Sequence, residues 1–188
     1  MSTLLSRLVR LCPLLLCPAA SAEGADTTPT AIFDLDRYLG TWYETARFEN
    51  FFERGLHDVS AVYERMKDGS IRITNSGTRE NGTRKTATGT ATKEADSPAG
   101  ELQVSFIPPH ALFSTDYRIL YITPGYEGAL VSDSDGDNLW LLQRRKGGDA
   151  EVQEQLLDEA RRRGFDTTQL IYPTTSSKCG SEAEVDAE

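Results

Sequence analysis

The chain has 188 residues, a formal net charge of −9 and 38% hydrophobic residues. Phosphate backbones and anionic bilayer surfaces repel a chain of this charge, so we expect no nucleic-acid partner. A chain of this length suits a single domain, and the sequence shows no internal repeat and no linker that would divide it.

The first 22 residues have the pattern of an export signal. Arg7 and Arg10 form a basic start, a short apolar stretch runs from Leu11 to Cys17, and Ala20-Ser21-Ala22 is a small-residue cleavage site. Pro13 interrupts the apolar stretch, which is too short to span a bilayer. The pattern therefore favours cleavage over a retained membrane anchor.

Cleavage would leave a mature chain that begins at Glu23 and carries a formal charge of −11, because two arginines are lost with the signal. The alternative is a lipid-anchored protein of the outer membrane, which needs a small residue directly before a cysteine. Cys12 and Cys17 both follow leucine, which argues against this anchor. Only Cys179 remains, so the fold must hold without a disulfide inside the chain. We expect a periplasmic or secreted protein.

From residue 40 to residue 145 the sequence alternates with a period of two, in short segments separated by turn residues such as Asn81-Gly82 and Pro124-Gly125. This pattern predicts an all-β, eight-stranded antiparallel up-and-down sheet. A sheet this long avoids exposed edges by closing into a barrel. The eight segments are GTWYETARF, DVSAVYERM, SIRITNSGT, KTATGTATK, ELQVSFI, DYRILYIT, GALVSDS and NLWLLQR.

One helix follows the predicted barrel. Asp149 can cap its start, Val152, Leu156 and Ala160 form one apolar stripe, and Gly164 can end it. The stripe predicts that this C-terminal helix packs against the outside of the barrel. The segment TQLIY that comes next predicts a short ninth strand.

These elements divide the chain into four parts. Residues 1–22 are the signal peptide, residues 23–34 a flexible segment, residues 35–175 the barrel domain and residues 176–188 an acidic tail. The tail lacks the apolar residues that would order it, so we expect it to be disordered.

One parity of each strand should face the barrel interior, and several residues of that parity are small. A core packed only against itself would use larger residues there, because close packing leaves few voids. Small and aromatic residues on different walls favour a cup that holds one small ligand, and a filled barrel is the alternative. The residues that we expect to line the cup are Ala46, Ala61, Tyr63, Ile73, Ala87, Ala91, Val104, Phe106, Tyr117, Ile119, Tyr121 and Trp140.

Glu44 is the polar member of the inward parity. A buried carboxylate needs partners or a raised pKa, and the hydroxyl of Tyr63 or Tyr121 could supply a hydrogen bond. A satisfied polar group is favoured over a ligand contact, because buried polar groups are generally hydrogen-bonded.

The segments GTWYETARF, FERGL, GALV and LWLLQRR resemble the lipocalin family, and the likeness covers about Leu35 to Tyr172. More narrowly, they resemble the bacterial outer-membrane lipocalins and their apolipoprotein D relatives. Gly40-Thr41-Trp42 is similar to the family's first motif, and Arg144 stands at the arginine of its third. The resemblance implies that Trp42 plugs the closed end of the barrel and that Arg144 lies across its indole ring.

The family's middle motif lies at the turn between the sixth and seventh strands. Thr123-Pro124-Gly125-Tyr126 stands at this turn, so we assign the role of the motif to Tyr126. A literal Thr-Asp-Tyr at Thr115 to Tyr117 begins the sixth strand instead, and we interpret it as coincidence.

The resemblance implies a carrier of a small hydrophobic or amphipathic ligand, with no cofactor. For this branch the implied ligand is a fatty acid or a lysophospholipid, and the implied role is envelope lipid maintenance or scavenging. A lipid-acting enzyme and a filled-barrel interaction protein are the alternatives. His57 and His110 are lone histidines, and no G-x-S-x-G or P-loop motif is present, so we expect no catalysis.

Two further segments bear on partners. Phe51 and Phe52 lie in the loop expected over the mouth of the barrel, where simple packing and contact with a membrane are both open. Residues 132–138, SDSDGDN, resemble a calcium loop but lack its glycine and its last glutamate, so we expect no metal site.

Overall fold

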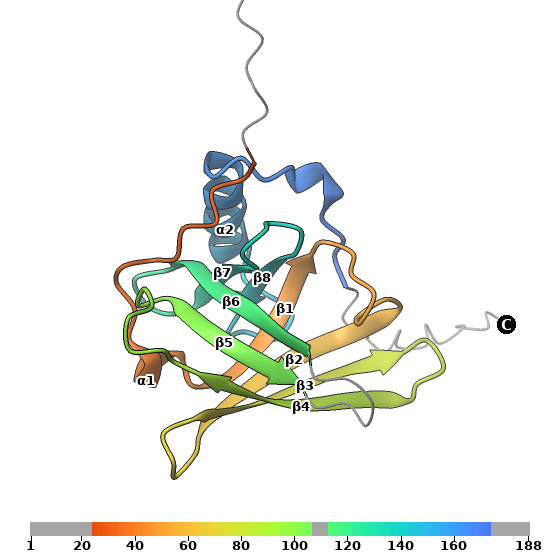
Figure 1. Ribbon diagram of the computed structural model, residues 1–188. Coiled ribbons are helices and arrows are strands. Elements are labelled where there is room, and N and C mark those ends of the chain that lie inside the picture. The colour runs from red at the N-terminus through yellow and green to blue at the C-terminus, as the bar shows by residue number, and fades with distance from the viewer. Residues whose placement is uncertain (1–23, 107–112, 174–188) are drawn as a thin grey trace, which may run out of the picture.

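The computed structural model describes residues 24–106 and 113–173. Eight antiparallel strands form a closed barrel in which each strand pairs with the next and the last pairs with the first (Figure 1). This confirms the predicted up-and-down barrel. The strands are β1 (Gly40–Arg47), β2 (Leu56–Arg65), β3 (Ile71–Arg79), β4 (Arg84–Thr92), β5 (Glu101–Phe106), β6 (Phe113–Ile122), β7 (Gly128–Ser132) and β8 (Leu139–Gln143).

Glycines make two of the tight turns between strands. Gly69, between β2 and β3, has a φ of +88°, and Gly82, between β3 and β4, has a φ of +80°. Residues with a Cβ rarely adopt this region, whereas glycine enters it without steric cost. The turn residues in the sequence therefore place these hairpins correctly.

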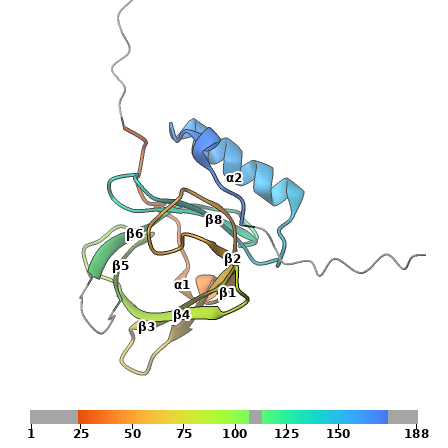
Figure 2. The same cartoon turned by 90° about the vertical axis from the view of Figure 1, so that its right-hand side faces the viewer.

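Two helices flank the strands: α1 (Leu35–Tyr38) precedes β1, and α2 (Ala150–Arg162) follows β8. Asp34 and Asp149 cap them, because each carboxylate accepts hydrogen bonds from two backbone N–H groups of the first turn. In Figure 2, α2 lies outside the ring of strands, and α1 appears within it. Tyr38 of α1 belongs to the core inside the barrel, so this helical turn closes one end.

Apolar side chains form two clusters, one on each side of the barrel wall. The inner cluster fills the closed end and includes Trp42 and Ile73. The outer cluster lies between the wall and α2 and joins Leu141 of β8 to Leu156 and Ala160 of the helix. The stripe along α2 is therefore the face that packs on the barrel, as predicted.

The N-terminal segment, which we expect to be flexible, contacts the rest of the chain through long-range backbone hydrogen bonds at two points. The backbone N–H of Asp26 donates to the carbonyl of Arg163 at 2.8 Å, and that of Thr30 donates to the carbonyl of Ile119 at 2.8 Å. These long-range backbone bonds tie the segment to the end of α2 and to β6.

The predicted ninth strand is not present among the described residues, and a short helix and a single bridge stand in its place. Thr167–Gln169 forms a short 3₁₀ helix, η1, whose first turn is capped by Asp166. Beyond it, Ile171 forms an isolated bridge with Arg47 at the end of β1, with backbone bonds of 3.0 and 2.8 Å. The segment therefore returns to the barrel at one residue pair rather than along a strand.

Several expectations concern residues outside the described ranges. They are the signal peptide with Cys12 and Cys17, residue His110, and the acidic tail with Cys179. Across residues 24–106 and 113–173, none of the helices combines the length and the apolar character that a membrane crossing requires.

Candidate functional site

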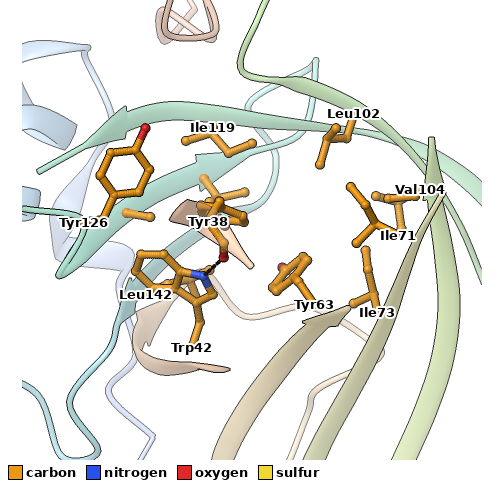
Figure 3. Packing of buried hydrophobic residues seen from close by; sticks show 13 residues of the cluster. Tyr38, Trp42, Tyr63, Ile71, Ile73, Leu102, Val104, Ile119, Tyr126 and Leu142 are labelled. Carbon is orange, nitrogen blue, oxygen red and sulfur yellow. Dashed lines mark hydrogen bonds between the residues drawn. The ribbon is translucent and has the colours of Figure 1, made fainter. Parts of the chain in front are cut away.

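The closed end of the barrel is built around Trp42, which is fully buried. Its Nε1 donates a hydrogen bond to the carbonyl of Tyr38 at 2.8 Å (Figure 3). The guanidinium of Arg144 lies 3.8 Å from the centre of the Trp42 ring and donates to the backbone carbonyls of Arg37, Tyr38, Leu39 and Thr41. Gly40 has a φ of +97° there, with Arg144 3.4 Å from where a Cβ would stand. The structure thus contains the plug that the two motifs imply.

Tyr126 joins the turn before β7 to the start of α1. It adopts a φ of +65°, and its hydroxyl accepts a hydrogen bond from the backbone N–H of Asp34 at 2.7 Å. The guanidinium of Arg37 lies 3.9 Å from the centre of its ring, a cation–π contact. Tyr126 therefore fastens the start of α1, the helical turn that closes this end of the barrel.

A cavity of about 100 Å³ lies in the barrel above this plug. Its wall is mostly apolar, and it includes seven of the twelve residues that the sequence predicted for the cup. These seven are Ala61, Tyr63, Ile73, Val104, Phe106, Tyr117 and Trp140.

Three other predicted residues lie on the strands as expected but outside this wall. Ala91 and Ile119 are fully buried in the inner cluster below the cavity. Ala87 is exposed on β4. The cavity wall therefore uses only part of the inward positions that the sequence predicted.

Ala46 and Tyr121 are corrections, because both pack in the outer cluster instead of the cup. The register of β1 against β8 shifts between Glu44 and Ala46, and that of β6 against β7 shifts between Ile119 and Tyr121. An extra residue in one strand reverses the inward parity beyond it. The small size of Ala46 thus serves contact with the outer layer.

Polar residues at the cavity include two that the sequence reading missed, Glu53 and Asn75. Glu53 comes from the loop after β1, and its carboxylate accepts hydrogen bonds from Trp140 Nε1 at 2.9 Å and from Asn50. Because Glu53 lies in a loop, the alternation of residues along a strand could not predict its place in the cavity wall. The aromatic segment FENFFERGL, which contains Glu53, was the sequence signal for a loop near the cavity.

Glu44 is paired with Arg47, and not with the hydroxyl of Tyr63 or Tyr121 as expected. The Arg47 guanidinium, which is almost fully buried, bonds the Glu44 carboxyl and donates to the backbone carbonyl of Glu53 at 2.9 Å. Burial raises the pKa of Glu44 well above its usual range, the charge of Glu53 raises it further, and Arg47 opposes both effects. Arg47 is thus the cation that directly bonds the Glu44 carboxyl and also holds the loop at Glu53.

Three tyrosines form a hydroxyl cluster at the base of the cavity. The hydroxyl of Tyr117 lies 2.7 Å from the hydroxyls of both Tyr38 and Tyr63. Burial raises the pKa of all three, that of Tyr63 to about 12, so they are uncharged at neutral pH. The site as a whole offers an apolar space with hydroxyls below and a carboxyl pair beside it.

Residues 33–175 match the model of a family described as the lipocalin-like domain. The outer membrane lipoprotein Blc of Escherichia coli (strain K12) is 36% identical over 174 residues, which cover 87% of this chain and 97% of that protein. Blc of Vibrio cholerae is 38% identical over 146 residues, which cover 77% and 84%. Apolipoprotein D of Mus musculus is 33% identical over 91 residues, 46% of this chain and 48% of that protein.

Solved structures show the same fold at lower identity. Insecticyanin from the tobacco hornworm Manduca sexta superposes with a TM-score of 0.70 at 18% identity, covering 82% of this chain and 87% of that one. Lobster apocrustacyanin A1 gives a TM-score of 0.63 at 18% identity, covering 77% and 81%. The family match spans the whole barrel, from α1 to the segment after η1, and the chain therefore belongs to the lipocalin family.

Proposed function

We propose that this protein is an exported carrier that holds a fatty acid or a lysophospholipid in its barrel, for envelope lipid maintenance or scavenging. The cavity of about 100 Å³ above the plug carries this proposal. Each buried methylene contributes about 0.8 kcal/mol, so an acyl chain gains affinity from the apolar wall without any charged contact. The relatives named as outer membrane lipoproteins support a place in the envelope.

Native mass spectrometry of protein purified from its own membrane extract tests the proposal directly. We expect a bound species with the mass of a monoacyl lipid, and we expect added fatty acid or lysophospholipid to change the emission of Trp140, which lines the cavity. A protein that carries no lipid and responds to neither ligand would be a filled-barrel interaction protein. A bound lipid that is converted on incubation would indicate an enzyme.

The loop between β1 and β2, residues 48–55, supports a second proposal, that the carrier touches membranes while it exchanges ligand. Phe51 and Phe52 are 81% and 60% exposed, and their rings contact each other edge to face at 5.8 Å. Exposed neighbouring aromatics are typical of interaction sites. Replacing both by serine should reduce the fraction that floats with phospholipid vesicles. Ile32→Ser is the matched control, since Ile32 is 84% exposed on the N-terminal segment, and equal flotation of both variants would contradict the proposal.

We also propose that the signal is cleaved after Ala22 and that the protein is released rather than anchored. The small-residue site is better formed than the sequence around Cys12 or Cys17. Intact-mass measurement of the exported protein should give a chain that begins at Glu23. A diacylated cysteine at its N-terminus would support the outer-membrane alternative instead.

A further inference from the structure

The polar wall of the cup is rich in hydrogen-bond acceptors. Glu44, Glu53 and Asn75 all line the cavity, and Asn75 does so from β3. Among the described residues that line this cavity, none is lysine, arginine or histidine. A ligand therefore meets acceptors and hydroxyls in the cup, and no cation.

Arg47, the cation that bonds Glu44 of the cavity wall, is already engaged. It bonds the Glu44 carboxyl and the backbone carbonyl of Glu53, and it is not part of the cavity wall. Its guanidinium is therefore not available to a ligand in the cup. A further anion in the cup would have no counter-charge, and burying an unpaired charge is strongly unfavourable.

Asn75 provides an independent observation on the other side of the cavity. Its Oδ1 is buried and accepts no hydrogen bond within the described part of the chain. Buried acceptors are generally paired, and leaving one unpaired is costly. A ligand that brings an N–H or O–H group into the cup relieves this cost, whereas a carboxylate does not.

We propose, as a refinement that rests on the carrier function above, that the polar group a ligand brings into the cup is a hydrogen-bond donor without negative charge. A hydroxyl donates to the carboxylate of the pair or to Asn75. An ammonium group donates charge-assisted hydrogen bonds to the same acceptors. A fatty acid must then keep its carboxylate out of the cup, at the mouth.

Three ligands with the same saturated chain, dodecanol, dodecylamine and dodecanoate, separate the head group from the tail. Tryptophan emission of the full mature protein at neutral pH gives each affinity. The chain makes the same apolar contribution to the binding free energy of all three ligands. Differences in affinity therefore report the contribution of the head group. We expect the alcohol and the amine to bind about tenfold or more tightly than the carboxylate, which corresponds to one hydrogen bond or ion pair gained or denied.

Glu44→Gln and Glu53→Gln each remove a carboxylate from the wall. In either variant the gap between dodecanol and dodecanoate should shrink to about threefold or less. Glu44 is buried and its variant can fail to fold, whereas Glu53 lies in a loop, so the second variant keeps the test intact. Glu64→Gln is the matched control, because this glutamate is 56% exposed on β2 outside the cavity wall. The difference in affinity between dodecanol and dodecanoate in this variant should equal that in the parent protein.

The outcomes separate this inference from the carrier function. Dodecanoate that binds as tightly as dodecanol, or a gap unchanged in both cavity variants, overturns the inference while leaving the carrier function supported. Failure of all three ligands to bind overturns both.

Discussion

Replacing Arg144 by alanine should lower the melting temperature by about 6–12 °C. The Arg144 side chain donates to four backbone carbonyls between Arg37 and Thr41, at 2.7 to 3.1 Å, and stacks 3.8 Å above the centre of the Trp42 ring. Two of these carbonyls belong to α1, one to Leu39 between the two elements and one to Thr41 of β1. The variant therefore releases the turn that closes the barrel.

The magnitude follows from the exposure of these groups. Arg144 is partly exposed, so water can reach some of the freed carbonyls, and the four bonds together count as about one charge-assisted bond, 1.5–3 kcal/mol. The cation–π contact adds about 0.5–1 kcal/mol. The sum is about 3 kcal/mol, and each kcal/mol moves the melting temperature of a chain of this size by about 2–4 °C.

Thermal unfolding followed by circular dichroism measures the shift. Arg145→Ala is the matched control, because this neighbouring arginine is 72% exposed and pairs with Asp149 only at the surface, so its loss should move the melting temperature by about 2 °C or less. Trp42→Ala should cost about 3–5 kcal/mol, and the double variant should show coupling of about 1 kcal/mol. Equal melting temperatures for Arg144→Ala and Arg145→Ala would refute the plug.

Two further predictions concern the cup. Ala61→Phe, in the cavity wall, should weaken lipid binding in a tryptophan titration while largely sparing stability, whereas Ala91→Phe, fully buried below the cavity, should overpack the core and cost about 1–3 kcal/mol in urea unfolding. Unchanged lipid affinity in Ala61→Phe would contradict the prediction that Ala61 borders the space for the ligand. Because the folded state raises the pKa of Glu44, protonation favours folding, and the free energy of unfolding should fall as the pH rises above about 4.5. Urea unfolding at pH 5 and pH 8 should show this loss in the parent but not in Glu44→Gln, and parallel losses would exclude Glu44 as the cause.

The inward positions were predictable where the period is undisturbed, as on β3, on β5 and on β2 from Ser60 onward. On β2, β3 and β5 the inward parity read from the sequence places Ala61, Ile73 and Val104 in the cavity wall. Residues directly opposite on paired strands share a face, so one correct strand constrains its neighbours. The motif residues Trp42 and Arg144 then identify which end of the barrel is closed.

The meaning of small residues was less predictable from one strand alone. A Cβ added at Gly89 would lie 2.7 Å from the ring of Phe106, so this glycine is small because an aromatic ring on β5 occupies its space. Ala61, by contrast, borders free volume. Both positions have the same parity and similar size, and only the side chain opposite distinguishes a packed contact from a cup.

The irregularity in β1 explains both the failed prediction for Ala46 and the polar cluster of the cup. Residues three apart on a regular strand point to opposite faces, which would separate Glu44 from Arg47 across the wall. The shifted register instead pairs Glu44 with Leu142, Ala46 with Leu141 and Arg47 with Trp140. Leu142 and Trp140 line the cavity and Leu141 lies in the outer cluster, so Glu44 and Arg47 share the inner face and Ala46 lies on the outer one. The same extra residue that removes Ala46 from the cup therefore brings a buried cation beside Glu44 and under the loop that carries Glu53.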